Sequence, residues 1–485
     1  MDYKNRIDSY KDEIVEMLCE LVSYKSIVGE PKANAPFGTE VQRVFEYMLD
    51  KGRAEEFDVV NIDNYGGHYE WQGLETDESG EVVATADETL GIPVHLDVVP
   101  EGNNWTYEPF NAEIVDGKIY GRGTTDNKCS AAAIFFAMKA LKESGFVPQK
   151  NVRVILGLDE ESSWEGMGKY LERVSPPDFG FVPDANFPAI NGEKGILTFE
   201  LAKKLARTNE KGMVIRKLEG GSAANMVPDF ARAVILDQIH DDYDDVKDSL
   251  ADFRSRTGYK IHGKGVGKAF EIVVQGISAH GSLPEKGLNA ISIMMQFLAE
   301  IELANESMRE FIGFYNERIA FETTGNELGI ALSDEASGNL SLNIGLVEMY
   351  GEAIVITCDV RYPVSLCDDD VYDALAPLLP IYNLGIVKKM HKKPIYMPAD
   401  GDFIRTLMKV YQDNTGDYDS SPITIGGGTY ARAFPNSVAF GPYFTGREDV
   451  MHQNDEYISI EDLIKITHIY ADAIYSLAGG ADNLG

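Results

Sequence analysis

Along the first 190 positions, apolar residues recur at helical spacing in some segments and form short continuous runs in others. Between residues 6 and 24, Ile14, Leu18, Leu21 and Val22 recur at the spacing of an amphipathic helix. Further helices are expected at KCSAAAIFFAMKALKES (128–144), closed by Gly145, and at SSWEGMGKYLERV (162–174), where a serine is available as a cap. Strands are expected at GIPVHLDVV (91–99), VRVILGL (152–158) and FGFVPDA (179–185). This alternation predicts an α/β domain with a parallel sheet.

The pattern changes after about Gly192. Polar inserts near 203–213 and 240–258 separate apolar runs such as KAFEIVVQGISA (268–279) and GEAIVITCDVRYP (351–363), which favours an α+β domain on an antiparallel sheet. Helix and strand alternate again from Asp400 to a last amphipathic helix at 459–478. We therefore predict a discontinuous first domain (1–192 and 396–485) with a second domain (193–395) inserted into it.

Composition and charge restrict the possible functions. The chain has 485 residues and a net charge of −34, which would repel nucleic acid and anionic membranes; the plainer reason for this charge is an acidic surface that aids solubility. We find no apolar stretch of about 18 residues and no signal peptide, so a cytoplasmic protein is expected. The four cysteines lack CxxC spacing, which argues against a thiolate zinc site. Cys129 is expected to be a small helix residue.

Polar residues stand where the expected strands end. His95, Glu160, Glu161 and Asp184 each lie at or just after an apolar run. Ligands of parallel sheets gather at the carboxyl ends of the strands, so these side chains are expected to meet. In PVHLD, the His-x-Asp spacing lets Asp97 orient the ring of a metal-bound histidine. The plainer alternative is a buried histidine bonded to a neighbouring acid.

Two adjacent glutamates end the strand in GLDEESSW. Adjacent side chains do not both bind one cation comfortably, so the expected division is Glu161 as ligand and Glu160 as general base. Asp126, in GRGTTDNKC, could bridge two cations with its two oxygens; alternatively, it could cap the helix that begins near Lys128. For His452, in MHQNDE, the alternative is a surface histidine.

Together, the motifs HxD, GxGxxD, DEES, PDA and a late MHxxDE closely resemble the M20 family of metallopeptidases, in particular its PepV-type dipeptidases, over essentially the whole chain. The resemblance implies a di-zinc aminopeptidase-like catalytic domain with an inserted lid. It implies two zinc ions, with cobalt or manganese as substitutes, bridged by Asp126; His95 and Asp184 would hold one ion, Glu161 and His452 the other. It also implies a cis peptide after Asp126.

The same resemblance gives roles to residues of the inserted domain. His280 would donate to the oxyanion of the intermediate, while Asn225 and Arg361 would hold the substrate's free carboxylate; without the family, His280 is a loop histidine and Arg361 a surface charge. The loop containing Gly426, Gly427 and Gly428 would lie near the substrate, and Arg432 receives no role. The remaining histidines are expected to be structural or exposed: His68, His240, His262, His391 and His468.

The function expected from this resemblance is hydrolysis of dipeptides by a monomer. A water between the two metal ions would lose its proton to Glu160 and attack the peptide carbonyl, and His280 would stabilise the resulting oxyanion. Two alternatives stay open. One is an N-acyl amino acid deacylase with the same metal site, and the other is a metal-binding protein without catalysis.

Overall fold

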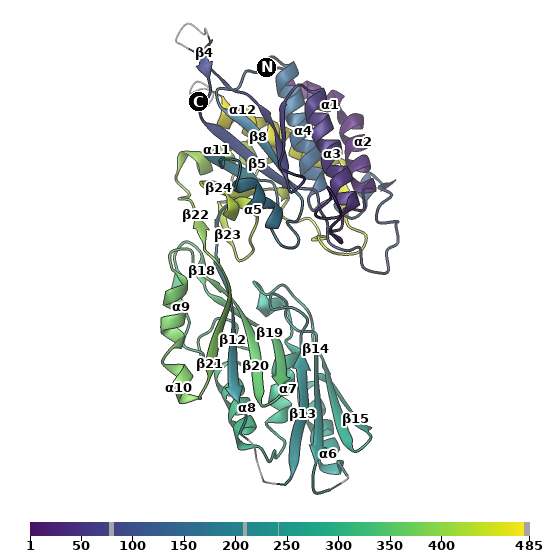
Figure 1. Cartoon of the computed structure of the whole chain (residues 1–485), viewed down its shortest axis with the longest axis vertical. Coiled ribbons are helices and arrows are strands. Elements are labelled where there is room, and N and C mark those ends of the chain that lie inside the picture. Colours follow the sequence, from purple (N-terminus) through teal and green to yellow (C-terminus); the bar gives the residue numbers. More distant parts are fainter. Residues whose placement is uncertain (77–81, 207–210, 241, 480–485) are drawn as a thin grey trace. The chain divides into compact units, whose positions relative to one another are not determined.

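The computed structural model describes residues 1–76, 82–206, 211–240 and 242–479. The chain divides into two compact units (Figure 1). Unit 1 comprises residues 1–191, 397–423 and 428–485, and unit 2 comprises residues 192–396 and 424–427. Part of the polar insert near 203–213 and residue 241 of the second insert fall outside the described residues. The rest of the second insert contains a helix, α6 (Asp244–Thr257).

Unit 1 is built around a mixed sheet. Its order is β1-β2-β8-β5-β9-β24-β11; β11 continues into unit 2 at Gly192, where it pairs with β22, and it also pairs with β23, which includes residues of both units. The central strands β8, β5, β9 and β24 are parallel, whereas β1, β2 and β11 run antiparallel to their neighbours. The α/β class is confirmed, but the expectation of an all-parallel sheet is wrong at both flanks. The strands are β1 (Asp58–Asn61), β2 (Gly67–Trp71), β5 (Thr89–His95), β8 (Asn151–Gly157), β9 (Phe179–Val182), β11 (Ala189–Glu193), β22 (Ile395–Tyr396), β23 (Ile423–Ile425) and β24 (Ser437–Phe440).

Helices cover this sheet, and unit 1 also contains several short strands. The amphipathic helix expected at 6–24 is two helices, which meet at Tyr10, and the predicted serine cap of α5 is absent because Trp164 occupies the N-cap position. The helices are α1 (Tyr3–Ser9), α2 (Lys11–Ser23), α3 (Thr39–Ala54), α4 (Lys128–Glu143), α5 (Glu165–Leu171), η2 (Tyr430–Ala433), α11 (Asp402–Thr415) and α12 (Ile460–Ala478). The short strands are β3 (Leu74–Thr76), β4 (Val82–Thr85), β6 (Glu113–Val115), β7 (Lys118–Tyr120), β10 (Ala185–Asn186), β25 (Pro442–Tyr443) and β26 (Tyr457–Ser459).

The core of unit 1 centres on α4. Its alanine-rich sequence lets α1, α2 and α12 pack closely against it, and nearly all of its side chains are buried. Gly145, which follows α4, has a φ of +80°, as expected for a residue that ends a helix. Among the described residues, no helix is both long and apolar enough to cross a membrane.

Unit 2 is an antiparallel sheet, as predicted, in the order β15-β16-β14-β13-β19-β20-β12-β21 (Figure 1). Helices α6, α7 and α8 pack against it and share its apolar core. The strands are β12 (Gly195–Lys204), β13 (Met213–Gly220), β14 (Phe230–Asp237), β15 (Lys260–Val266), β16 (Ala269–Gln275), β17 (Ser333–Asp334), β18 (Gly338–Asn339), β19 (Ser341–Tyr350), β20 (Ala353–Tyr362) and β21 (Gly385–Lys392). The other helices are η1 (Pro284–Lys286), α7 (Ala290–Leu298), α8 (Glu306–Arg318), α9 (Asp368–Leu375) and α10 (Leu378–Ile381).

A short return segment, residues 424–427, packs with unit 2 although the sequence analysis assigned it to the first domain. The Thr424 hydroxyl donates to the carbonyl of Ala336 at 2.8 Å, and the carbonyl of Ile425 accepts from the N–H of Lys194 at 2.9 Å. Gly426 and Gly427 of the predicted glycine loop therefore belong to unit 2, and Gly428 belongs to unit 1.

Candidate metal centre

Three parallel strands of unit 1 bring four of the expected side chains to one edge of the sheet. His95 is the last residue of β5, Glu160 and Glu161 follow the end of β8, and Asp184 follows the end of β9. Since β5 pairs in parallel with both β8 and β9, the carboxyl ends of all three strands lie side by side. The placement follows directly from the strand topology.

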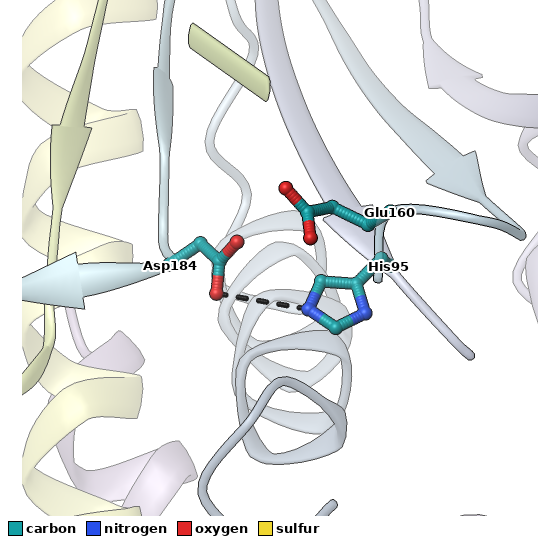
Figure 2. Close-up of side chains that lie close together, drawn as sticks. All are labelled: His95, Glu160 and Asp184. Carbon is teal, nitrogen blue, oxygen red and sulfur yellow. Dashed lines mark ion pairs between the residues drawn. The ribbon is translucent and has the colours of Figure 1, made fainter. Parts of the chain in front are cut away.

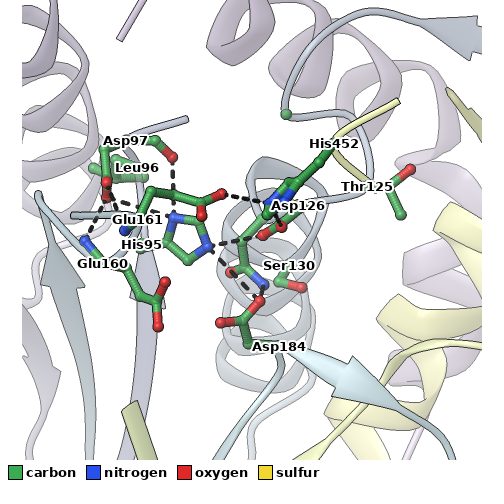
Figure 3. A network of polar contacts seen from close by, with 12 residues as sticks. His95, Leu96, Asp97, Thr125, Asp126, Ser130, Glu160, Glu161, Asp184 and His452 are labelled. Atoms are coloured by element: carbon green, nitrogen blue, oxygen red, sulfur yellow. Dashed lines mark hydrogen bonds and ion pairs between the residues drawn. The ribbon is translucent and has the colours of Figure 1, made fainter. Parts of the chain in front are cut away.

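Asp126 lies between two histidines. Its Oδ1 is 2.9 Å from Nε2 of His95, and its Oδ2 is 3.0 Å from Nε2 of His452 (Figure 3). It does not cap α4, because Asn127 occupies the N-cap position. The peptide bond from Asp126 to Asn127 is cis, as the resemblance implied. Each carboxylate oxygen thus faces a different imidazole, the arrangement expected of a ligand that bridges two cations.

His452 reaches this site from a loop far along the chain. Besides Asp126, its Nε2 contacts Oε1 of Glu161 at 3.0 Å. The backbone of His452 has a φ of +57°, a left-handed conformation that is uncommon outside glycine. Its side chain is half exposed, so one face of the site is open to solvent on unit 1.

A second group of side chains meets at the same ring nitrogen of His95 that faces Asp126. Nε2 of His95 is 3.7 Å from Oδ1 of Asp184, and potential ligand atoms of His95, Glu160 and Asp184 all lie within 4.8 Å of one another (Figure 2). A matching group consists of His95, Asp126 and Glu161. Its position alone would also allow Glu160 to bind a metal ion. Its assignment as the base rests on the argument that two adjacent glutamates do not both bind one cation comfortably.

The electrostatics favour cations in this site. Burial raises the pKa of Glu161 to about 7 and that of Asp184 to about 6, and raises the pKa of Glu160 well above its ordinary value. Burial would lower the pKa of His452, but the carboxylates of Asp126 and Glu161 raise it to about 11. Buried carboxylates outnumber the imidazoles, so divalent cations would offset an excess of negative charge. Imidazole nitrogen and carboxylate oxygen are ligands that suit zinc, cobalt and manganese.

Asp97 supports the two glutamates as well as the histidine. Strand β5 ends at His95, and Nδ1 of His95 lies 3.0 Å from the backbone carbonyl of Asp97 and 3.5 Å from its Oδ1. The carboxylate of Asp97 accepts hydrogen bonds of 3.1 Å from the backbone N–H groups of both Glu160 and Glu161. It is fully buried. One carboxylate therefore fixes the loop that carries the proposed base and a proposed ligand.

Sequence reasoning missed further residues that support the site. The side-chain amide of Asn127 donates to Oδ1 of Asp184 at 2.9 Å. The indole N–H of Trp164 donates to the carbonyl of Glu160 at 2.8 Å, and the ring of Tyr430 packs edge-on against Trp164. Both Asn127 and Trp164 stand inside motifs already noted for their acids, but nothing in a linear pattern shows that they point at a neighbouring motif.

Unit 2 brings the segments of Asn225 and His280 together. The N–H of Gly281 donates to the carbonyl of Asn225 at 2.7 Å, and Met226 forms an isolated β-bridge with His280. Nδ1 of His280 accepts from the N–H of Ser282 at 3.2 Å, and lies 2.6 Å from the Ser282 hydroxyl. With Nδ1 as an acceptor, the neutral ring carries its proton on Nε2. The His280 side chain is exposed.

Arg361 is buried, not a strand-edge surface charge. Its Nε and Nη2 lie 3.0 and 2.9 Å from Oδ2 of Asp359, and its Nη1 donates to the carbonyl of Gly426 at 2.9 Å. The Cβ position of Gly426 lies 2.7 Å from Cβ of Ser282, so a side chain there would collide with the His280 segment. Unit 2 thus gathers His280, Asn225, Arg361 and Gly426 into one region.

The remaining histidines have no place in either site. His68 is buried against the hydroxyl of Tyr170 at 2.8 Å, His391 contacts the hydroxyl of Tyr362 at 2.8 Å, and His468 contacts Asp8 at 2.9 Å. His240 and His262 are exposed. All four cysteines are free, and Cys129 is buried in α4 as expected.

Comparison with known proteins places this site in a family. A model described as "Peptidase family M20/M25/M40" matches residues 91–476. The chain is 35% identical over 482 residues to a Bacillus subtilis protein named "Putative dipeptidase YtjP", which covers 99% of this chain and 100% of that protein. It is 34% identical to a Staphylococcus epidermidis protein named "Putative dipeptidase", over 98% of this chain and 99% of that protein.

Solved structures share the fold. Human carnosine dipeptidase 1 aligns with a TM-score of 0.53 and 18% identity, covering 98% of this chain and 99% of its own. An aminoacylhistidine dipeptidase from Vibrio alginolyticus aligns with a TM-score of 0.55 and 16% identity, covering 96% of each chain. The match of the family model, over most of the chain, confirms the resemblance drawn from the motifs: this chain belongs to the peptidase family M20/M25/M40.

Proposed function

We propose that this protein is a dipeptidase that uses two zinc ions to hydrolyse dipeptides with a free carboxylate. The observation that carries the proposal is the position of Asp126, whose two oxygens face two different histidines at 2.9 and 3.0 Å. The name that relatives at 35% and 34% identity bear supports the same substrate class.

The chain offers a ligand set for each ion. His95, Asp184 and one oxygen of Asp126 would hold the first, and Glu161, His452 and the other oxygen of Asp126 would hold the second. When bound, such a pair of ions polarises the peptide carbonyl and lowers the pKa of a water molecule. Cobalt or manganese would suit these donors as well.

Glu160 would act as the general base. Its carboxylate lies beside both His95 and Asp184, and burial raises its pKa well above the ordinary value. A carboxylate in such a setting can accept a proton from the attacking water and pass it to the leaving amine. Asp97 and Trp164 hold the Glu160 backbone from both sides, through its N–H and its carbonyl. This support would keep the base in place during proton transfer.

The residues gathered in unit 2 would bind the substrate. His280, with its Nε2 proton, would donate to the oxyanion of the intermediate. Asn225 and Arg361 would hold the substrate carboxylate, and the backbone of the glycine loop 426–428 would lie near it. Asp359 pairs with Nε and Nη2 of Arg361, and the carbonyl of Gly426 accepts from Nη1. A substrate carboxylate would therefore bind the remaining N–H groups of Nη1 and Nη2.

We also propose a cytoplasmic monomer. Four free cysteines are typical of a reducing compartment. A face of the unit 2 sheet carries a ladder of ion pairs in which Arg232 contacts Glu271 at 2.5 Å and Glu219 at 3.2 Å. The cores of obligate dimer interfaces are depleted of such charges, which supports a monomer.

An assay that compares substrates tests the proposal. The protein, supplied with Zn²⁺, Co²⁺ or Mn²⁺, is given a series of unblocked dipeptides and the matching N-acetyl amino acids. Turnover of the dipeptides alone would support the dipeptidase. Faster turnover of the N-acetyl amino acids would instead identify an N-acyl amino acid deacylase, and no turnover of either would contradict a hydrolase.

A further inference from the structure

Glu456 lies four residues after His452 and is fully buried beneath the metal centre. Its carboxylate has more partners than any ligand in the proposed set. Oε1 accepts from the backbone N–H of Thr125 at 2.8 Å and of Asp126 at 3.1 Å. Oε2 accepts from the N–H of Gly123 at 3.0 Å. Three backbone donors of a single turn therefore converge on one side chain from the other end of the chain.

A buried arginine completes this arrangement. Nη1 of Arg122 lies 2.7 Å from Oε2 of Glu456, and both side chains are almost wholly shielded from solvent. The guanidinium also lies over the ring of Trp105, with its carbon 5.2 Å from the ring centre. The backbone carbonyl of Glu456 accepts from the N–H of Gly121 at 2.8 Å. Every residue from 121 to 126 except Thr124 is thus hydrogen-bonded to this one position.

The turn needs such support because its conformation is unusual. Gly123 has a φ of +89°, and a Cβ there would lie 2.9 Å from Cγ1 of Val98. On the other side, His452 and Asp455 both have left-handed backbones, with φ of +57° and +54°. Asp455 is fixed by the N–H of Thr106, which donates to its Oδ1 at 2.7 Å. Neither segment is part of a long helix or strand that could hold its shape alone.

We propose that Glu456 is a positioning residue: it holds the turn that carries Asp126 at the correct place relative to His452, so that the second cation of the proposed pair can bind. The inference rests on the proposed metal site. The first cation depends less on Glu456, since His95 and Asp184 are placed by strands β5 and β9. Loss of the Glu456 carboxylate should therefore weaken one cation site more than the other.

The experiment uses Glu456→Gln in the full chain, with Co²⁺ as the probe. The amide NH₂ group would face the N–H of Gly123 and the Arg122 guanidinium, which are themselves donors. The substitution would therefore break these hydrogen bonds without changing the size of the side chain. Glu461→Gln, at an exposed position in the first turn of α12, is the matched control. Arg122→Lys keeps a positive charge beside Glu456 and should retain most of the binding.

Co²⁺ is titrated into each protein after dialysis against a chelator, and its visible absorption and bound stoichiometry are measured beside the urea unfolding midpoint. We expect Glu456→Gln to bind about one Co²⁺ tightly in place of two, with the second weakened roughly 10- to 100-fold, as for other residues that orient metal ligands. The control Glu461→Gln should bind like the wild type, and Arg122→Lys should retain most of the binding.

Equal Co²⁺ binding by Glu456→Gln and the wild type would overturn the inference while leaving the metal site intact. A wild type that binds no Co²⁺ would overturn the proposed function and the inference with it. If Glu456→Gln does not fold, Arg122→Met combined with Glu456→Gln removes both buried charges; wild-type Co²⁺ binding by that double variant would also overturn the inference, and selective loss of the second ion would support it.

Discussion

The indole nitrogen of Trp164 donates a 2.8 Å hydrogen bond to the backbone carbonyl of Glu160. Trp164 itself has a left-handed backbone, with a φ of +58°, directly before α5. The ring therefore turns back over the loop that follows β8. This contact links the proposed base to the start of a helix, and it makes Trp164 a test of how rigidly the base must be held.

Trp164→Phe should lower kcat about 5- to 10-fold, because it removes one hydrogen bond worth about 1 kcal/mol while keeping an aromatic ring against Tyr430. The bound metal should not change. The measurement is kcat together with metal content, and Trp71→Phe in β2 serves as the control. An unchanged kcat, or an equal loss in the control, would remove Trp164 from the support of the base.

Glu160→Gln should lower kcat by a factor of about 10²–10⁴, the range for loss of a general base, and leave metal content near that of the wild type. The physical reason is that the amide cannot accept the proton, although it keeps the size of the side chain. Glu165→Gln, at the exposed start of α5, is the control. Substantial loss of metal would instead identify Glu160 as a ligand.

A chelator should abolish activity and lower the unfolding temperature. Without cations, the carboxylates around Asp126 repel one another, and a ligand that binds only the folded state stabilises it by mass action. Zn²⁺, Co²⁺ or Mn²⁺ should restore both properties. Differential scanning calorimetry measures the unfolding temperature, and the dipeptide assay measures the activity. Full activity after exhaustive chelation, with the absence of metal checked by elemental analysis, would contradict the prediction.

Arg361→Lys should raise KM for an unblocked dipeptide roughly 10- to 100-fold, because a charged hydrogen bond is worth about 1.5–3 kcal/mol and lysine lacks the planar fork. A dipeptide amide, which has no carboxylate to bind, should be affected far less. Steady-state kinetics on both substrates give the ratio, with Arg318→Lys on α8 as the control. An equal effect on acid and amide would mean that Arg361 supports the fold and does not read the carboxylate.

His68 makes stability fall at mildly acidic pH. Burial lowers its pKa to about 3, with a smaller effect from Arg153. An unfolded histidine has a pKa of about 6.5, so the unfolded chain binds the extra proton between these values. The contribution of neutral His68 to the free energy of unfolding is complete above about pH 6.5. It is lost as the pH falls toward 3, and the loss is about 2 kcal/mol at pH 5.

The measurement is urea unfolding of the wild type and His68→Gln at pH 7.5 and pH 5. The loss of stability between the two pH values should be smaller in His68→Gln by about 2 kcal/mol. His262→Gln, at an exposed position of β15, should lose as much as the wild type. An equal loss in all three proteins would show that another group governs the acid limb.

Much of this protein could be predicted from local patterns. Apolar runs located the strands around His95 and Glu160, because a buried strand needs a continuous apolar sequence. The acids that follow those runs indicated a functional site, because charged groups at the end of a buried strand are unfavourable unless they are paired or bind a metal. The order of the motifs is by itself specific enough to identify the family.

Other features have no linear signal. The antiparallel flanks of the unit 1 sheet were missed because an apolar run carries no record of its direction. The break at Tyr10 lies inside a continuous amphipathic pattern. The return of residues 424–427 to unit 2 depends on single contacts, such as that of Gly426 with Arg361, which no pattern of polarity could reveal.

The sequence by itself determined the fold class, the family and the types of side chain at the site, because these follow from local polarity and from motifs with fixed spacing. Only the tertiary structure decided which atoms face each other. It set one oxygen of Asp126 toward His95 and the other toward His452, and it placed Glu456 beneath both segments. Such relations arise when distant segments pack, and the packing depends on the shapes and directions of whole elements.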